Sequence, residues 1–337
     1  MEWKFATTLI GSQPYTNPVE AVAKTLDGRV SCPSWPQMPA KGLEERMFYQ
    51  TGVHLPGLKV SDDKIVVDLD SYDPTDIYTA ILSEDVDFFV HPPNVYEGLY
   101  QFLENDVSSF TAVKGQVTGP ISEGLQIADS KSRPVIYDES YSEIVRKTVN
   151  MMAKWQARRL SMCNSTVIMF YDEPSMSVLG TPFASISDEQ AIQWINEVLE
   201  GVDAFRGVHC CGNTNWEMLL STNIEIMSFD AYLYGDNILM YPDALNKFYA
   251  KGGSLAWGIV PNADDSIVIE TVDSLVAKLE SLFDKLEEKG INRQKAAAHS
   301  LITPQCGLGG TSVENVDKVF DLLAGVSAEM RSRYGFQ

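Results

Sequence analysis

Short apolar runs alternate with longer amphipathic segments along most of this 337-residue chain. The runs are rich in β-branched and aromatic residues and have the length of buried strands. Eight strands are expected, at residues 5–10, 28–32, 112–117, 165–171, 205–209, 225–229, 254–259 and 297–302. The longer segments repeat apolar residues at helical spacing, which predicts helices with one buried face. These cover residues 18–26, 142–162, 187–200, 214–221, 241–251, 267–289 and 312–333.

The alternation of strands and helices predicts an α/β fold, a (β/α)8 TIM barrel. An open doubly wound sheet is the main alternative, but eight strands are many for it and no Gly-x-Gly-x-x-Gly follows the first strand. The rhythm breaks over residues 40–110, which hold a hairpin candidate at 64–70 and helices near 74–83 and 95–104. We therefore expect one barrel domain over residues 1–337, with an insertion of about 40–110 after the second strand.

The composition limits where the chain acts and what it binds. There are 26 Lys and Arg against 46 Asp and Glu, and this formal net charge of −20 argues against nucleic acid or an anionic membrane surface as a partner. The first residues show no basic region followed by an apolar run, so we expect no signal peptide, and no stretch is long and apolar enough for a membrane span. Five cysteines, two of them adjacent, do not look like a disulfide framework. A cytoplasmic protein is expected.

The cysteines indicate metal chemistry instead. His209 and Cys211 form a His-x-Cys pair at the end of the fifth predicted strand, and Cys306 follows the eighth. Zinc prefers imidazole and thiolate ligands, and strand alternation puts His209 and Cys211 on one side and Cys210 on the other. Because active sites of barrels lie at the carboxyl ends of the strands, we predict a zinc site there. Asp230, at the end of the sixth strand, is a candidate fourth ligand; the alternative is that these are ordinary structural residues.

Two further strand ends carry groups suited to an amino acid. Asp172 follows the fourth strand in an Asp-Glu-Pro sequence, where a carboxylate is placed to accept hydrogen bonds from an ammonium group, or else simply begins a helix. Ile10, Gly11 and Ser12 follow the first strand and offer backbone donors to a carboxylate, although a plain turn is the more common meaning. The apolar segment 35–39 is expected to fold over the barrel mouth.

Taken together, these motifs resemble the catalytic domain of cobalamin-independent methionine synthase, within the uroporphyrinogen decarboxylase and methionine synthase-like barrel superfamily. Residues 7–14 (Thr-Thr-Leu-Ile-Gly-Ser-Gln-Pro) are similar to that family's Thr-Thr-x-Ile-Gly-Ser-x-Pro opening, and residues 172–174 match its Asp-Glu-Pro motif. The His-x-Cys pair matches the family's first zinc ligands, and residues 304–308 (Pro-Gln-Cys-Gly-Leu) match the segment with the last one. The family has a metal-binding Glu where this chain has Asp230.

The resemblance implies zinc-dependent methylation of the homocysteine thiol to give methionine. It implies no catalytic residue beyond the metal site. Ile10 and Ser12, joined by Gly11, would contact the homocysteine carboxylate, and Asp172 would bind its ammonium group. Of the two acids beside Arg46, we prefer Glu45 over Glu44 as a second anchor for the same amino acid. The implied zinc ligands are His209, Cys211, Asp230 and Cys306.

Two departures from the family bear on the methyl donor. This chain has one barrel where the folate-dependent enzyme has two, and residues 259–262 (Ile-Val-Pro-Asn) hold no acid where the family has a His that protonates the departing folate. A nitrogen leaving group needs such a proton, whereas cobalt(I) leaves without one. We therefore expect methylcobalamin or another methylated corrinoid as the donor rather than methyl-folate, either free or bound to a corrinoid carrier protein.

Two other functions remain open. A corrinoid-dependent methyltransferase acting on another thiol, such as coenzyme M, would share the barrel, and the His-x-Cys-Gly-Asn run at 209–213 is similar to that of such enzymes. A uroporphyrinogen decarboxylase-like barrel or a binding protein without metal would require the cysteines to be structural. The Ile-Gly-Ser and Asp-Glu-Pro motifs favour homocysteine as the substrate.

Overall fold

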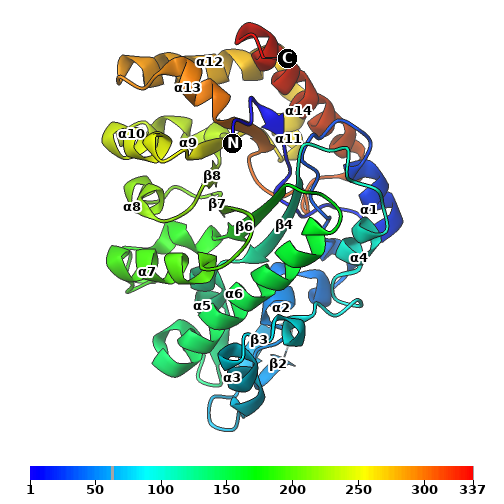
Figure 1. Ribbon diagram of the computed structural model, residues 1–337, viewed down its shortest axis with the longest axis vertical. Helices are drawn as coiled ribbons and strands as arrows, with labels where there is room; N and C mark the ends of the chain where they lie inside the picture. Colours follow the sequence, from blue (N-terminus) through cyan, green and yellow to red (C-terminus); the bar gives the residue numbers. More distant parts are fainter. Residues whose placement is uncertain (62–63, 337) are drawn as a thin grey trace.

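The computed structural model describes residues 1–61 and 64–336 of the chain. Seven parallel strands form one curled sheet, in which the last six strands lie side by side in sequence order and the first strand pairs with the last (Figure 1). From one edge to the other they are β1 (Ala6–Thr7), β10 (Ser300–Pro304), β9 (Ser254–Val260), β8 (Ile226–Phe229), β7 (Phe205–Cys210), β6 (Val167–Asp172) and β4 (Val113–Thr118). A parallel sheet is covered on both faces, which explains why these segments read as nearly continuous apolar runs.

The closed eight-stranded barrel is the part of the fold prediction that is wrong. Residues 28–32, expected as the second strand, form no regular strand and lie in the gap between the edge strands β1 and β4. Cys32 meets Thr8 through a single isolated bridge, and the residues after it meet β4 in the same way. Pro33 has no backbone N–H to donate, so a continuous ladder cannot run through this segment. The sheet therefore curls like a barrel without an eighth strand to close it.

Helices cover the outer face of the curled sheet, and α14 packs near α1 at the gap (Figure 1). They are α1 (Pro18–Thr25), α5 (Pro120–Gln126), α6 (Glu139–Ser161), α7 (Asp188–Leu199), α8 (Trp216–Ser221), α9 (Ala231–Ile238), α10 (Pro242–Ala250), α11 (Asp264–Ile269), α12 (Val272–Glu288), α13 (Arg293–Ala298) and α14 (Val313–Arg333). The helix expected over 267–289 is divided, because Thr271 caps a new helix by accepting a hydrogen bond from the Ser274 N–H. None of the helices within the described ranges is long and apolar enough to cross a membrane.

The segment expected as an insertion has secondary structure of its own. It contains α2 (Met47–Gly52), the antiparallel strands β2 (Leu58–Ser61) and β3 (Lys64–Val67), α3 (Thr75–Leu82) and α4 (Glu97–Leu103), and β3 also pairs with β5 (Ala128–Asp129). The predicted hairpin thus forms, with residues 62–63 outside the described ranges. The hairpin and α3 lie at one end of the molecule, beyond α2 (Figure 1). Thr118 ties α2 to β4, since its N–H donates to Thr51 Oγ1 over 3.0 Å and its hydroxyl donates to Met47 O over 3.0 Å.

Two apolar clusters lie on opposite faces of the curled sheet. The smaller cluster includes Ile168 and Phe170 of β6, and the larger cluster, which extends to the outer helices, includes Met169 and Tyr171. Successive side chains of a strand point to opposite faces, so the row that contains Ile168 and Phe170 continues into Asp172 at the carboxyl end. The interior row of the sheet therefore changes from apolar to polar at the end of the strand, where the candidate site lies.

Candidate functional site

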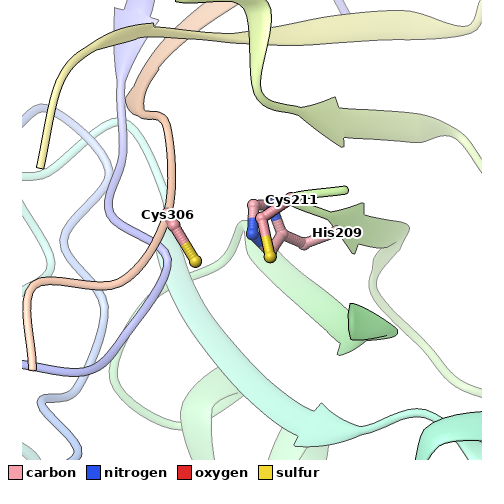
Figure 2. Close-up of side chains that lie close together, drawn as sticks. All are labelled: His209, Cys211 and Cys306. Atoms are coloured by element: carbon pink, nitrogen blue, oxygen red, sulfur yellow. The ribbon is translucent and has the colours of Figure 1, made fainter. Parts of the chain in front are cut away.

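Three potential metal ligands meet at the carboxyl ends of β7 and β10. One ligand atom each from His209, Cys211 and Cys306 lies within 4.8 Å of the other two. Figure 2 shows the Cys306 sulfur approaching from the segment after β10, across from the His209 and Cys211 side chains at the end of β7. Cys210 is buried and its Sγ donates to Gly212 O over 3.4 Å, so it does not join this group. The three residues selected from the sequence are thus brought together by the fold.

The His209 imidazole is oriented by the neighbouring strand. Its Nδ1 lies 3.0 Å from Ser228 Oγ, and the two residues are paired in the β7–β8 register. Its Nε2 is buried and has no hydrogen-bond partner within the described residues. A hydrogen bond at one ring nitrogen leaves the lone pair of the other available, which is the usual arrangement for a metal-binding histidine. The unpaired nitrogen beside two thiols fits a zinc ion.

The two thiols of the cluster contact each other and cannot ionise independently. The pKa of Cys211 is lowered to about 4, mainly by the hydrogen bond with the Cys306 thiol and secondly by the one with His209. The same contact with Cys211, together with burial, raises the pKa of Cys306 above its usual range. In the absence of a cation, one thiolate therefore makes the second unfavourable. A bound divalent cation reverses this penalty and holds both sulfurs as thiolates.

Asp230, the expected fourth ligand, lies outside the three-residue cluster. One carboxylate oxygen accepts a hydrogen bond from Leu233 N over 2.9 Å at the start of α9, and the other accepts from Gln305 Nε2 over 3.2 Å. Burial raises its pKa to about 6. Both oxygens thus have protein partners, and a ligand role would require at least one of them to be released. That role stays a prediction.

A cavity of about 470 Å³ opens over the ligand cluster. Its wall includes the metal cluster and most of the predicted amino-acid anchors. The lining residues are Ile10, Ser12, Gln37, Pro39, Glu45, Arg46, Met47, Phe48, Asp172, Pro174, His209, Cys211, Cys306, Gly307, Gly309 and Gly310. Segment 35–39 contributes two of them, in agreement with its expected place over the barrel mouth. Of the two candidate acids, Glu45 is buried in this wall whereas Glu44 is exposed.

The acids at the end of β6 point to opposite sides and have different surroundings. Asp172 is 7% exposed, lines the cavity, and has one carboxylate oxygen with no partner in the described chain. Burial raises its pKa, against the opposing effect of the Lys114 and His209 charges. Glu173 is fully buried and accepts hydrogen bonds from two N–H groups at the start of α5 and from Ser122 Oγ at 2.6 Å. Asp172 is thus the member of the pair that is available to a ligand.

Glu45 provides a second carboxyl group in the cavity wall. Its oxygens accept hydrogen bonds from Gln50 Nε2 over 3.1 Å and from Glu97 N over 3.3 Å. Burial raises its pKa to about 7. This group therefore changes its charge near neutral pH, and a positively charged ligand beside it would favour the ionised form.

The Cys306 segment packs directly against the Ser12 segment. Ser12 Oγ accepts a hydrogen bond from Gly309 N over 3.2 Å, and a Cβ added at Gly307 would come within 2.1 Å of the same oxygen. On the other side, Asn262 Nδ2 donates to Gly307 O over 2.8 Å. Asn262 belongs to segment 259–262, which holds no acid, and its side chain holds the Cys306 segment in place. The expected metal and carboxylate sites belong to one packed unit.

Lys114 and Gln116 are site-adjacent residues that the sequence analysis missed. Both are buried in β4, and burial lowers the pKa of Lys114 to about 7. They alternate with Val113 and Val117, a pattern that normally indicates a solvent-facing row of polar side chains. Here the polar row faces the interior of the curl. A signal was present in the sequence: a charged and an amide residue lie two positions apart in a strand of a sheet that is covered on both faces.

Comparison with known proteins finds similarity at the level of the fold. No family model matches the chain, and no curated protein matches it. The structure of a B12-independent methionine synthase from Shewanella sp. W3-18-1 in complex with selenomethionine aligns with a TM-score of 0.62 at 14% identity, over 98% of both chains. A putative vitamin-B12 independent methionine synthase from Listeria monocytogenes aligns with a TM-score of 0.56 at 13% identity, over 94% of this chain and 86% of that one. The fold is therefore that of a methionine synthase-like domain.

The names of both neighbours contradict the expected corrinoid donor. Each is B12-independent, so methylcobalamin or another corrinoid as the methyl source is a wrong prediction, and nothing supports a corrinoid carrier protein. The prediction rested on the single barrel and on the missing acid at 259–262. The first neighbour is B12-independent and is covered over 98% of its own length, so a single domain of this size does not imply a corrinoid donor. The predicted enzyme class, a methionine synthase-like methyltransferase, agrees with both names.

Proposed function

We propose that this chain is a zinc-dependent methyltransferase that methylates the thiol of homocysteine to give methionine, with a donor other than a corrinoid. One observation carries the proposal: the three metal ligands and Asp172 line the same cavity. The cluster suits a sulfur atom, and the carboxylate suits the ammonium group of an amino acid. The first neighbour was solved with selenomethionine, an amino acid that resembles the expected product.

His209, Cys211 and Cys306 would hold the zinc ion, with Asp230 as the proposed fourth ligand. Zinc supplies one chemical effect here, which is to lower the pKa of a bound thiol so that the nucleophilic thiolate dominates near neutral pH. Ser228 would hold the His209 ring through Nδ1, which leaves Nε2 for the metal. The chain's own contribution to the metal is therefore a preset set of ligands in the cavity wall.

The other wall residues orient the amino acid above the metal cluster. Asp172 accepts hydrogen bonds from the ammonium group, and Glu45, in the wall of the same cavity, adds a second negative charge when the ammonium group is present. Backbone N–H groups of the Ile10–Ser12 segment bind the carboxylate. Three anchored groups leave the sulfur little freedom, which aligns it with the methyl carbon for direct displacement. Because a nitrogen leaving group needs a proton, we choose methyl-folate as the first donor to test.

Methionine formation by the zinc-loaded protein tests this function. With homocysteine and methyl-folate, mass spectrometry should detect methionine, and removal of zinc by a chelator should abolish it; methylcobalamin is the comparison donor and should be inactive. Asp172→Asn should raise the KM for homocysteine by about tenfold to a hundredfold, because it weakens a hydrogen bond between charged groups. The surface variant Asp203→Asn should behave as the wild type.

Three results would contradict parts of the proposal separately. Zinc-loaded protein that yields no methionine with either donor would exclude the function. Product from methylcobalamin alone would reverse the donor assignment. An unchanged KM in Asp172→Asn would favour a thiol without an amino group, such as coenzyme M, over homocysteine.

A further inference from the structure

A fully buried lysine contacts the Ile10 segment of the cavity wall and has entered the site so far only through its effect on the pKa of Asp172. Lys114 of β4 is 0% exposed, and its Nζ donates to Ile10 O over 2.7 Å and to Gln116 Oε1 over 3.0 Å. The ammonium group also lies 4.7 Å from the centre of the Phe170 ring. It forms no salt bridge with any acid in the described ranges. Lysine is rarely buried without an ionic partner, so these contacts call for an explanation.

The hydrogen bond to Ile10 determines which way the next peptide faces. The described chain contains no cis peptide bond, and in a trans peptide the C=O and N–H point in opposite directions. Since Ile10 O points to the Lys114 ammonium group, the Gly11 N–H points away from that group. Neither the Gly11 nor the Ser12 N–H donates a hydrogen bond within residues 1–61 and 64–336. Ile10 and Ser12 line the cavity, where a ligand could satisfy these donors.

Gln116 supports both Lys114 and the glycine above it. Its Oε1 accepts the lysine hydrogen bond, and its Nε2 donates to Trp35 O over 3.0 Å. A Cβ at Gly11 would lie 2.7 Å from Gln116 Cδ, and the φ of Gly11 is +146°, which a residue with a side chain rarely adopts. The Ile10–Ser12 segment therefore rests on Lys114 and Gln116 in a single conformation.

Gln156 of α6 joins this pair to the rest of the fold. Its Oε1 accepts hydrogen bonds from Trp35 Nε1 and from Gln116 N, both over 2.8 Å. Its Nε2 lies 3.2 Å from Gln116 O and 3.1 Å from His91 Nε2 in the insertion. All the hydrogen-bonding capacity of the amide is used, so the amide is locked. Lys114 thus belongs to a buried hydrogen-bond network that also includes Gln116, Gln156 and Trp35.

We propose that Lys114 is a positioning residue for the substrate carboxylate: it holds the Ile10 carbonyl so that the Ile10–Gly11 peptide turns its N–H toward the cavity. The charged donor also polarises this peptide, which strengthens the N–H as a donor to an anion. The inference rests on the proposed function in one respect, since it takes the substrate to be a thiol with an α-carboxylate.

Binding of three thiols to the zinc-loaded protein tests this role by titration calorimetry. The probes are homocysteine, aminopropanethiol, which lacks the carboxylate, and mercaptobutanoate, which lacks the ammonium group. Lys114→Met should weaken the binding of homocysteine and mercaptobutanoate by about tenfold or more, because a hydrogen bond to a charged group is lost from the support of the carboxylate site. Its zinc content and its affinity for aminopropanethiol should equal those of the wild type.

Asn150→Ala is the matched control. Asn150 Nδ2 donates to the carbonyls of Val198 and Glu200 over 2.9 and 2.8 Å, so this variant also loses buried hydrogen bonds, in this case to the end of α7. It should leave the preference for homocysteine over aminopropanethiol unchanged. Where Lys114→Met does not fold, Lys114→Gln replaces it and is expected to show the same selective loss.

Equal weakening of all three thiols, or of none, in the Lys114 variant overturns the positioning role, because a merely structural residue has no reason to select the carboxylate. The outcome is separable from that of the proposed function. A wild-type protein that binds no thiol at all contradicts the proposed function itself. Tight homocysteine binding by the wild type together with unchanged selectivity in the variant contradicts only the role of Lys114.

Discussion

The metal-ligand cluster and the network around Lys114 lie in the same curled sheet but differ in how their polar groups are satisfied. In the cluster, His209 Nε2 has no partner within the described chain, and the contact that favours ionisation of Cys211 raises the pKa of Cys306. In the network, Gln156 has a partner for every donor and acceptor. The closed network is completed by the chain alone, whereas the open cluster needs an added cation. Substitutions in the two regions should therefore affect different properties.

Loss of a cluster thiol should have the largest effect. Cys306→Ser removes one of the three ligands, and we expect zinc affinity to fall by more than about a hundredfold, since even residues that only support a ligand contribute ten- to a hundredfold. The stability of the metal-free chain should change little. Chelator competition measures the affinity, with Cys163→Ser as the control because Cys163 lies outside the cluster. Wild-type zinc affinity in Cys306→Ser would remove Cys306 from the ligand set.

Disruption of the network should affect stability instead of metal binding. Gln156→Leu leaves Trp35 Nε1 and the Gln116 N–H without their acceptor, and each unpaired buried donor costs about 1–3 kcal/mol. We expect the free energy of unfolding in urea to fall by about 2–6 kcal/mol, with normal zinc affinity in the folded protein. Gln193→Leu, on an exposed position of α7, is the control. A stable variant with weakened zinc binding would reverse the comparison.

A third buried group sharpens the contrast and should give the smallest effect. Glu123 of α5 is fully buried, and neither carboxylate oxygen has a partner in the described ranges, yet it lies outside the cavity wall. Burial, with the nearby Glu173 charge, raises its pKa well above the usual value. The folded state therefore holds a proton that the unfolded state releases above its normal pKa, so stability decreases as pH rises through this window.

Glu123→Gln should remove the decrease in stability with rising pH, because glutamine has no proton to release. Thermal unfolding from about pH 5 to about pH 8 should show the wild type falling relative to the variant, with Glu217→Gln, an exposed acid, following the wild type. Parallel curves for the wild type and Glu123→Gln would mean that Glu123 is not neutral in the folded protein. Glu123 and His209 Nε2 are both buried without a hydrogen-bond partner in the described chain, so this result would also weaken the argument that the unpaired His209 nitrogen marks a ligand site.

The strands were predictable wherever burial on both faces made the sequence continuously apolar. The run at 165–171 corresponds to β6, and that at 205–209 to β7, each within about two residues. The expected strand at 28–32 failed because Pro33 interrupts the pairing at its end. A single β-branched run does not reveal whether its neighbours can form a ladder with it, so the closure of the sheet could not be predicted from local pattern.

The site shows a similar division. The metal cluster could be predicted because histidine and cysteine are rare in this chain and fell at strand ends, and the structure brings the three together. Lys114 was missed, because a lysine between Val113 and Gly115 looks the same whether the polar row faces solvent or the interior. The methyl donor was inferred from the single barrel and from a missing acid at 259–262, and neither feature identifies the group that carries the methyl.

The position of Glu173 has a consequence for the entropy of substrate binding. Its side chain is held at the start of α5 by backbone N–H groups and by Ser122, and its own N–H donates to His209 O over 2.8 Å. Asp172 precedes it directly, so its backbone has no freedom to rotate independently of the helix and the neighbouring strand. A carboxylate on a backbone that is already immobile loses few conformations when it meets a ligand. For Asp172, most of this ordering takes place once, when the chain folds, rather than in every catalytic cycle.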